Sequence, residues 1–350
     1  MDEASFKAIV SGKRRGLPAS LLRSLLAAAS LPYRLGMGLR NAAFDRGWKR
    51  SHSASVPVIS IGNVTTGGTG KTPFVAHVVN WLVQHGRRPA ILSRGYRALD
   101  GQANDEKLVL DRLCPGVPHI QNRDRVAGAR TAIDQHRADS LVLDDAFQHR
   151  RIARDLDIVL VDALNPWGFG HLLPRGLLRE PIAGLRRAGL VVVTRSDQAT
   201  PETLREIATR VRSVGCVAPI VETAFPATQL VSNQGAPRPL QDLCGQPVVA
   251  FCGIGNPGAF RLVLESAGMQ IARFHAFPDH HHFGPADLDV IRESLRQTGA
   301  AAAIATEKDL VKIASSDLAG RPLYAVRIET QIRTGASDLE QCLADCLTRK

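Results

Sequence analysis

Short apolar runs separated by helical stretches dominate the chain between residues 51 and 225. A strand is predicted for each of five such runs, and a helix from Lys71 to about His85 follows the first of them. The predicted strands are Val56–Ile61, Pro89–Ser93, Ser140–Leu143, Ile158–Val161 and Leu190–Thr194. Continuous apolar strands that alternate with helices are typical of a parallel α/β sheet with helices on both faces.

A second, smaller set of strands and helices is predicted near the C-terminus. Strands are expected at Val248–Cys252, Ile271–Ala276 and Ala302–Thr306, with helices at 257–267 and 285–298 between them. A stretch rich in proline and glycine, typical of a loop, precedes this set. The predicted parts of the chain are a basic N-terminal helical segment (1–50), a large α/β domain (51–225), a linker (226–247) and a smaller α/β domain (248–350).

The first 50 residues combine an amphipathic pattern with most of the net positive charge. Leu21, Leu22, Leu25 and Leu26 share one helical face, and leucines continue at four-residue spacing after Pro32, where the helix is expected to break. Ten Lys or Arg against three acids give this segment +7 of the chain's +11. Such helices also pack against their own domain, but the charge excess favours contact with an acidic membrane surface.

The composition narrows the class of protein further. Hydrophobic residues make up 44% of the chain and charged residues 22%, the balance of a folded globular protein. The six cysteines form no CxxC pair and are expected to be reduced thiols of a cytosolic protein. Only ten uncharged residues separate Arg23 from Arg34, against the roughly 20 that a membrane span needs, and no signal peptide is expected. Aromatic residues are scarce at 5%, which argues against nucleic-acid binding through stacked bases.

The strongest chemical signal follows the first predicted strand. Residues 65–72 read Thr-Thr-Gly-Gly-Thr-Gly-Lys-Thr, which is the phosphate-binding P-loop pattern except that Thr65 replaces the first glycine. Glycines let the backbone N–H groups point at phosphate oxygens, Lys71 brings a positive charge to the β- and γ-phosphates, and Thr72 can hold Mg²⁺. The predicted nucleotide-binding residues are Gly67, Gly68, Thr69, Gly70, Lys71 and Thr72.

Asp144 and Asp145 directly follow the third predicted strand. A P-loop enzyme needs acidic side chains at such a strand end to hold the metal ion or its water shell, although acids are also common in turns. Both are therefore predicted to bind Mg²⁺ together with Thr72. The fold class predicted is a P-loop nucleotide-binding sheet flanked by helices, with a smaller C-terminal α/β domain.

Three further polar clusters each allow two interpretations. Thr194-Arg195-Ser196-Asp197 resembles the base-reading loop of GTPases, which leaves a GTP-dependent switch or chaperone open, but it is as typical of a turn in which Asp caps a helix. Arg179-Glu180-Pro181 and Thr306-Glu307-Lys308-Asp309 are either solvated surface or, in a phosphoryl-transfer enzyme, sources of cations that stabilise the developing charge.

Three consecutive histidines follow Asp279. Neighbouring residues of an extended chain point to opposite faces, so His280, His281 and His282 are poorly placed to bind one zinc ion. A single histidine beside Asp279 that carries a proton is the preferred interpretation.

Taken together, these segments resemble the tetraacyldisaccharide 4'-kinase family, the lipid A 4'-kinases. The resemblance covers nearly the whole chain and rests on motifs in a fixed order. These motifs are Ile61-Gly62-Asn63, Gly70-Lys71-Thr72-Pro73, Ser93-Arg94-Gly95-Tyr96, Asp144-Asp145-Ala146-Phe147-Gln148-His149, Arg154-Asp155-Leu156-Asp157, Leu172-Leu173-Pro174, Leu178-Arg179-Glu180-Pro181, Phe251-Cys252-Gly253-Ile254, Asp279-His280-His281 and Thr306-Glu307-Lys308-Asp309-Leu310-Val311-Lys312.

The resemblance implies ATP- and Mg²⁺-dependent transfer of the γ-phosphate to the 4'-hydroxyl of a tetraacylated glucosamine disaccharide 1-phosphate, a step of lipid A biosynthesis. The family's proposed base and its histidine partner map onto Asp105, in Asn104-Asp105-Glu106-Lys107, and onto His280. An alcohol loses a proton as it attacks phosphorus, and a carboxylate held by an imidazole can accept that proton. With Lys71 and Arg179, these two residues make up the expected catalytic set.

The resemblance also implies where the protein works. The family has a membrane-facing N-terminal helix, which matches the basic segment 1–50. We therefore expect a peripheral enzyme at the cytoplasmic face of a bacterial inner membrane, monomeric and without a nucleic-acid partner, that takes a lipid substrate from an anionic surface.

Overall fold

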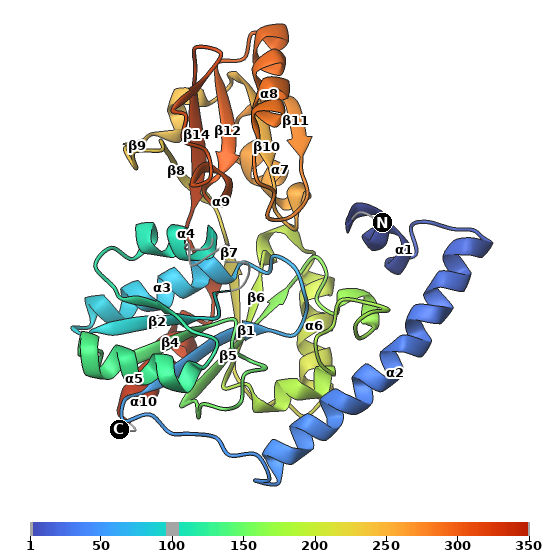
Figure 1. Ribbon diagram of the computed structural model, residues 1–350, viewed down its shortest axis with the longest axis vertical. Helices are drawn as coiled ribbons and strands as arrows, with labels where there is room; N and C mark the ends of the chain where they lie inside the picture. The colour runs from blue at the N-terminus through green and yellow to red at the C-terminus, as the bar shows by residue number, and fades with distance from the viewer. Residues whose placement is uncertain (1–2, 96–104, 349–350) are drawn as a thin grey trace. The chain divides into compact units, whose positions relative to one another are not determined.

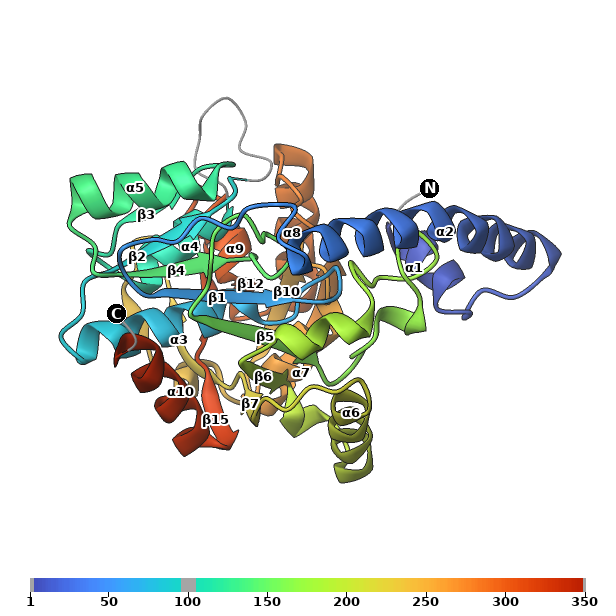
Figure 2. The ribbon, with the colours of Figure 1, turned by 90° about the horizontal axis from the view of Figure 1, so that it is seen from below.

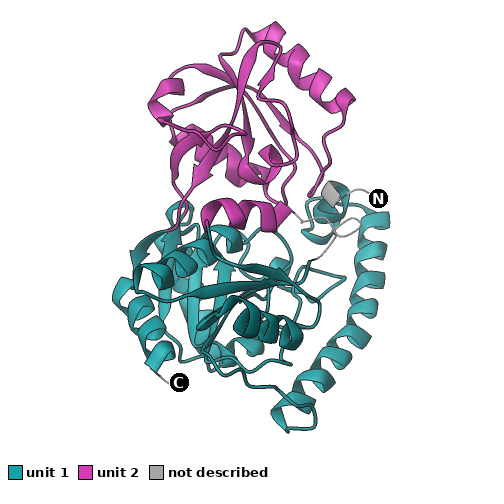
Figure 3. Ribbon diagram, turned by 60° about the vertical axis from the view of Figure 1, so that its left-hand side comes forward, with its two compact units in different colours: residues 1–96, 116–224, 331–350 teal, residues 97–115, 225–330 magenta. Residues whose placement is uncertain are grey.

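The structure, a computed structural model, describes residues 3–95 and 105–348. The chain forms two compact units, each assembled from segments that are distant in the sequence (Figure 3). Unit 1 comprises residues 1–96, 116–224 and 331–350, and unit 2 comprises residues 97–115 and 225–330. Two segments therefore differ from the sequence prediction, because 97–115 belongs to unit 2 and 331–350 belongs to unit 1.

Unit 1 is built on an eight-stranded sheet in the order β15-β7-β6-β5-β1-β4-β2-β3. Neighbouring strands run parallel except β15, which is antiparallel to β7 at one edge. The strands are β1 (Val58–Asn63), β2 (Pro89–Ser93), β3 (His119–Gln121), β4 (Ser140–Asp144), β5 (Leu156–Asp162), β6 (Leu190–Thr194), β7 (Ile220–Ala224) and β15 (Gln331–Thr334). After β1 the chain forms β2, β3 and β4 on one side of it, and then β5, β6 and β7 on the other side. The strand order therefore reverses at β1. Ligands of parallel sheets bind at the carboxyl ends of strands beside such a reversal.

Helices cover both faces of this sheet. In Figure 2, α3 (Lys71–Gln84) and α5 (Arg125–His136) lie on opposite sides of the strands. The side chain of Asp124 caps α5 by accepting hydrogen bonds from the backbone N–H groups of Val126 and Ala127. The other helical elements of unit 1 are α1 (Glu3–Val10), α2 (Leu17–Asp45), α6 (Pro201–Ser213), α10 (Ala336–Thr348), η1 (Gly168–Gly170), η2 (Ile182–Arg187) and η3 (Ser196–Gln198).

The central strands of unit 1 are buried along their whole length, as their apolar sequences predict. Every residue of β1 and of β4 is buried. β1 begins at Val58 and not at the predicted Val56. Its pairing with β4 starts where Val58 lies opposite Leu141, and Val56 lies before that point. The predicted class, a parallel α/β sheet with helices on both faces, is confirmed.

Helix α2 runs unbroken through Pro32, which contradicts the predicted break. Figure 1 shows it as one long helix at the edge of unit 1. Proline removes one backbone hydrogen bond, and tertiary contacts beside it hold the helix in place. The Ser30 hydroxyl donates to the carbonyl of Leu172 at 3.1 Å, and the Tyr33 hydroxyl donates to the carbonyl of Arg179 at 2.6 Å. The local signal for a break is thus overridden by packing.

Unit 2 contains a smaller mixed sheet in the order β11-β10-β12-β14-β8-β9, with β13 paired to β14. Its strands are β8 (Ala227–Val231), β9 (Pro237–Arg238), β10 (Pro247–Cys252), β11 (Gln270–Ala276), β12 (Ala302–Thr306), β13 (Asp317–Leu318) and β14 (Arg321–Ile328). Its helices are α4 (Asp105–Leu113), η4 (Leu240–Leu243), α7 (Pro257–Ser266), α8 (Pro285–Thr298) and α9 (Glu307–Leu310).

Residues 226–247, interpreted as a linker, instead contribute to the sheet of unit 2. β8 lies in this stretch and pairs antiparallel with β14, and its Leu230 and Val231 are fully buried. The prolines and glycines that suggested a linker surround a short hairpin between β8 and β9. Composition identified the turn correctly but could not reveal that the adjacent residues pair with a strand almost one hundred positions later.

Gly62 in β1 packs tightly against Phe147 in the loop after β4. A Cβ atom at Gly62 would lie 2.7 Å from both the Cβ and the backbone nitrogen of Phe147, which is itself fully buried. Backbone atoms cannot move aside as the end of a flexible side chain can, so this position requires glycine.

We predict that Gly62→Ala lowers the free energy of unfolding by about 1–3 kcal/mol, the cost of overpacking a core. Urea denaturation followed by circular dichroism measures the change. Gly38→Ala in α2 is the matched control, since a Cβ there meets nothing within 4 Å and alanine favours helix. Equal stability of Gly62→Ala and the unchanged protein would contradict the steric argument.

Candidate active site

The predicted P-loop connects β1 to α3 and has a backbone that suits phosphate. Gly67 has a φ of 110° and Gly70, which caps α3, a φ of 81°, values that favour glycine. A Cβ added at Gly67 or Gly68 would meet nothing within 4 Å, so the loop backbone borders open space. Backbone N–H groups at a helix start and a glycine-rich loop together favour bound anions.

Side chains from three strands brace this loop. The Asn63 amide donates to the Thr69 hydroxyl at 2.9 Å, and the Thr194 hydroxyl donates to the carbonyl of Thr69 at 3.0 Å. Arg195 donates to the carbonyl of Gly68 at 2.6 Å and pairs with Asp162 at 2.7 Å. Thr194 and Arg195 of the cluster 194–197 therefore position the P-loop, and the buried side chain of Thr69 attaches the loop to the end of β1.

Asp145 holds two cations together at the end of β4. Its carboxylate lies 3.5 Å from the Lys71 ammonium and 2.7 Å and 2.9 Å from the Arg179 guanidinium. Burial acts to raise the pKa of Asp145, but Lys71 and Arg179 outweigh it and hold that pKa well below its ordinary value. The residue has a positive φ of 52°, which Asp tolerates better than most residues and which is common at functional sites.

Asp144 occupies a different environment from its neighbour. It is the buried last residue of β4 and pairs in register with Ile61 of β1, which places it beside the start of the P-loop. Its backbone carbonyl accepts a hydrogen bond of 3.3 Å from buried Arg125, whose pKa is lowered to about 10 mainly by burial. Arg125 could not be recognised from the sequence, because an arginine at a helix start carries no distinguishing pattern.

Three residues near the P-loop fit a magnesium ion in chemical terms. Thr72 in the first turn of α3 and Asp144 at the end of β4 are both buried, and the partly exposed Asp145 follows Asp144. Mg²⁺ prefers oxygen ligands and is usually held by one or two carboxylates together with phosphate oxygens and water. Thr72, Asp144 and Asp145 supply a donor set of that kind.

The cluster around Arg179 and Glu180 is internal rather than solvated surface. The Arg179 backbone N–H donates to the carbonyl of Val64 at 2.8 Å, which ties this segment to the entry of the P-loop. Glu180 is 0% exposed and accepts hydrogen bonds of 2.8 Å from both Gln148 and Arg187. The cluster could be recognised in the sequence, but its partners Gln148, 32 positions before Glu180, and Arg187, seven positions after it, could not, since neither spacing forms a recognisable motif.

Unit 2 brings the two other predicted catalytic residues together. Asp105 begins α4, and its Oδ2 atom lies 3.2 Å from His280 Nδ1 and 2.8 Å from the Lys312 ammonium. Lys312 also lies 3.3 Å from buried Asp309. The structure therefore joins Asp105 to His280, as the resemblance implied, and adds Lys312, a residue of the motif 306–312 for which no role was predicted.

The protonation states of this pair are coupled. Burial acts to raise the pKa of Asp105, but hydrogen bonds from His280 and Lys312 outweigh it and lower that pKa below its ordinary value. The hydrogen bond to Asp105 raises the pKa of His280, against the opposing effect of burial. The carboxylate is thus kept ionised and the imidazole is biased toward its protonated form.

Neighbouring histidines turn to different partners, which agrees with the single-histidine interpretation. His280 has a positive φ of 61° and faces Asp105, whereas His281 Nε2 lies 2.9 Å from Asp287 and its ring stacks on Phe277. His281 therefore supports the local fold, and His280 alone of these two reaches the candidate base.

The cluster Thr306-Glu307-Lys308-Asp309 also proves to be largely internal. Asp309 is fully buried and accepts hydrogen bonds from the Gly253 backbone at 3.0 Å and the Thr306 hydroxyl at 2.6 Å. Lys308 pairs with Glu106 at 3.0 Å, beside Asp105. This motif joins α9 to α4 and fixes the start of α4, on which Asp105 stands.

A parallel sheet whose first strand leads through a glycine-rich loop to Gly-Lys-Thr at a helix start, with acids ending the neighbouring strand, defines a P-loop nucleotide-binding enzyme. Comparison with known proteins identifies which one. A sequence profile of the family described as tetraacyldisaccharide-1-P 4'-kinase matches residues 22–348. The chain belongs to this family.

Individual relatives agree with the profile. The chain is 40% identical over 359 residues to a tetraacyldisaccharide 4'-kinase of Anaeromyxobacter dehalogenans strain 2CP-C, covering 97% of this chain and 95% of the relative. It is 40% identical over 337 residues to one of Syntrophus aciditrophicus, covering 88% and 89%. The structure is similar to the "apo" form of LpxK from Aquifex aeolicus in complex with ATP, with a TM-score of 0.73 and 28% identity over 93% of this chain and 99% of the other.

The resemblance predicted from the sequence is thereby confirmed, together with the fold class and the kinase class. The family's activity is ATP-dependent phosphorylation of the 4'-position of the lipid A precursor. The alternative of a GTP-dependent switch is set aside, and the structure gives Arg195 of the supposed base-reading loop a bracing role instead.

We predict that Asp105→Asn lowers the pKa of His280 toward its ordinary value of about 6.5, because the hydrogen bond to a carboxylate raises it in the native protein. An NMR titration of the imidazole signals measures this shift. His275, which contacts Ser294 instead, is an internal control whose pKa should not change.

The same pair sets a pH dependence of stability. A raised folded-state pKa stabilises below the unfolded value of about 6.5, and this contribution is lost as pH rises through the folded value. His280→Gln should therefore cost more unfolding free energy near pH 6 than near pH 9. A cost that is independent of pH would contradict the ion pair.

Proposed function

We propose that this chain transfers the γ-phosphate of ATP to the 4'-hydroxyl of a tetraacylated glucosamine disaccharide 1-phosphate, with Lys71, Arg179, Asp105 and His280 as its catalytic residues. The observation that carries the proposal is the pairing of Asp145 with Lys71 and Arg179 at the P-loop. We also propose that a monomer suffices, because one chain supplies all of these residues.

In unit 1, the proposed task is to bind phosphate and to stabilise charge. Lys71 and Arg179 are held by one carboxylate, which keeps both cations beside the P-loop. Magnesium, held by Thr72, Asp144 and Asp145, would neutralise charge on the β- and γ-phosphates. Most of the catalytic effect in phosphoryl transfer comes from such positioning and electrostatic stabilisation.

In unit 2, the proposed task is to accept a proton. The bond between the γ-phosphorus and the bridging oxygen of ATP breaks, a bond from the 4'-oxygen to that phosphorus forms, and ADP leaves. The proton of the 4'-hydroxyl passes to the Asp105 carboxylate. Lys312 and His280 support this role, since both donate to Asp105 and keep it ionised.

We predict that Lys71→Ala lowers kcat by about 10²–10³-fold or more, because it removes a cation aimed at the transferred phosphate. Transfer of label from γ-labelled ATP to the disaccharide lipid in detergent micelles measures the rate. Asp145→Asn should be similarly impaired. Arg205→Ala removes an exposed surface pair with Glu202 in α6 and serves as the control, which should keep nearly full activity. Full activity of Lys71→Ala would contradict the proposed phosphate site.

We further propose that the protein works at the cytoplasmic face of the inner membrane, with α2 lying on the anionic surface. Six leucines of α2 are well exposed: Leu17, Leu21, Leu25, Leu31, Leu35 and Leu39. At 3.6 residues per turn these six fall within an arc of roughly 120°, so they form one apolar stripe along the helix. None of the described helices is long and apolar enough to cross a membrane. A stripe of this kind with basic flanks suits a helix that lies in the interface.

We predict that Leu35→Gln/Leu39→Gln weakens binding to vesicles containing phosphatidylglycerol by about tenfold or more, because each buried leucine contributes about 1.5–3 kcal/mol. Sedimentation with sucrose-loaded vesicles measures the bound fraction. Val217→Gln, at an exposed apolar position (92% exposed) outside α2, is the control. Unchanged binding of the double variant would remove α2 from the membrane contact.

A further inference from the structure

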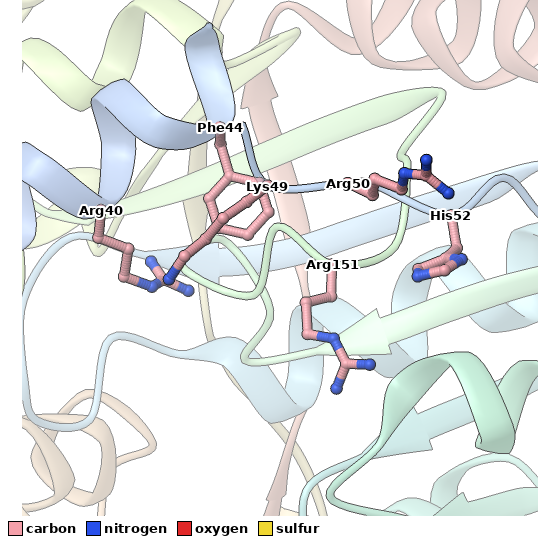
Figure 4. A pocket seen from close by; sticks show the side chains of 6 residues that line it. All are labelled: Arg40, Phe44, Lys49, Arg50, His52 and Arg151. Atoms are coloured by element: carbon pink, nitrogen blue, oxygen red, sulfur yellow. The ribbon is translucent and has the colours of Figure 1, made fainter. Parts of the chain in front are cut away.

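A cavity at the C-terminal end of α2 is lined mainly by cationic side chains and by none of the proposed catalytic residues. Its volume is about 420 Å³, within the range of about 300–1,000 Å³ typical of small-molecule sites. Figure 4 shows the side chains that line it, which come from α2, from the segment that follows it and from the loop after β4. They are Arg40, Phe44, Lys49, Arg50, His52 and Arg151.

Hydrogen bonds to backbone groups fix the chain segments around this cavity. The His52 N–H donates to the carbonyl of Arg151 at 2.8 Å, and the carbonyl of His52 accepts from Ala153 at 2.9 Å. Arg40 donates to the carbonyl of Gln148 at 2.6 Å, which attaches the end of α2 to the same loop. The backbone on both sides of the cavity and the side chain of Arg40 are thus fixed within unit 1, while Lys49, Arg50, His52 and Arg151 are exposed residues whose side chains can meet a ligand.

The charges in the cavity are poorly compensated. Within residues 3–95 and 105–348, Arg40, Lys49 and Arg50 have no carboxylate at ion-pair distance, and Arg151 has only Asp124 at 3.6 Å. Burial and the neighbouring Arg150 lower the pKa of Arg40, despite the opposing charge of Glu180. Four like charges around one cavity repel one another, and a bound anion would relieve that repulsion.

Apolar side chains next to these cations indicate what kind of molecule carries the anion. Leu39 is 73% exposed and Trp48 is 74% exposed, and they adjoin Arg40 and Lys49 in the sequence. Tryptophan favours the membrane–water interface, and arginine binds phosphate with geometric specificity. A free inorganic ion would make no use of Phe44, which lines the cavity, or of the exposed apolar side chains that neighbour its cations in the sequence.

We propose that this cavity binds the phosphate group of an amphiphile, a phospholipid headgroup at the membrane surface. The site is separate from the P-loop and from Asp105, so it would be a discrete lipid site in addition to the general attraction of the basic segment. Its occupation would fix the C-terminal end of α2 on the bilayer.

The test compares two double variants with the same change in charge. Lys49→Gln/Arg50→Gln removes two cations from the cavity. Arg14→Gln/Arg15→Gln removes two exposed cations that precede α2 and do not line the cavity. Calorimetry with the full-length protein measures binding of a short-chain phosphatidylglycerol below its micellar concentration. The measurements are made at about 0.15 M and about 0.5 M salt, since added salt screens diffuse attraction.

The expected result is saturable binding that the Lys49/Arg50 variant weakens about tenfold or more, while the Arg14/Arg15 variant stays within about twofold of the unchanged protein at the higher salt. Competition by inorganic phosphate at equal affinity would assign the site to free phosphate and overturn the lipid assignment. Equal weakening of both variants, or no saturable binding, would overturn the site itself. Both variants should keep kinase activity on substrate in micelles, and this readout separates failure of the lipid site from failure of the proposed catalysis.

Discussion

The arrangement at the P-loop depends on the ion pairs that the Asp145 carboxylate forms with Lys71 and Arg179. Lys71 stands at the start of α3 and Arg179 in the segment before η2, and two cations so close together repel unless a negative charge lies between them. Asp145 supplies that charge and, with its positive φ, turns the chain immediately after β4. One residue thereby joins the helix that follows β1 to a segment more than one hundred positions later, and it keeps both cations at the end of the sheet where phosphate is expected.

A second acid of unit 1, Glu180, is also paired with a cation, but inside the core. Glu180 is fully buried, and its charge is compensated by Arg187 and by hydrogen bonds from Gln148. A buried charge without such partners would be strongly destabilising, so the segment that carries Arg179 is fixed by its neighbour. Helix α2 contacts the same segment through Tyr33. The helix proposed to lie on the membrane is therefore hydrogen-bonded to the segment that carries Arg179, one of the residues proposed to act on phosphate.

In unit 2, carboxylates are likewise paired with a nearby cation, here around Asp105. Asp309 is buried and orients Lys312, which in turn contacts Asp105 at the start of α4. Without Lys312 and His280, burial alone would raise the pKa of Asp105 and favour its protonated form, which cannot accept a proton. The pair of donors explains why a partly buried carboxylate in this position can remain ionised. It also explains why a short motif such as Thr306-Glu307-Lys308-Asp309 carries so much charge away from solvent.

The sequence by itself determined the elements whose signals are local. Gly70-Lys71-Thr72 at a helix start, Asp144-Asp145 at the end of an apolar strand, and the alternation of buried strands with helices could all be predicted, because the chemistry of each lies within a few consecutive residues. Only the tertiary structure decided which distant residues meet. Lys312 reaches Asp105 from a distant segment, α2 continues through Pro32, and residues expected in a linker pair with β14. The physical reason is that partners of a buried charge or of an edge strand are selected by topology and packing, and a local pattern of residue types carries no record of either.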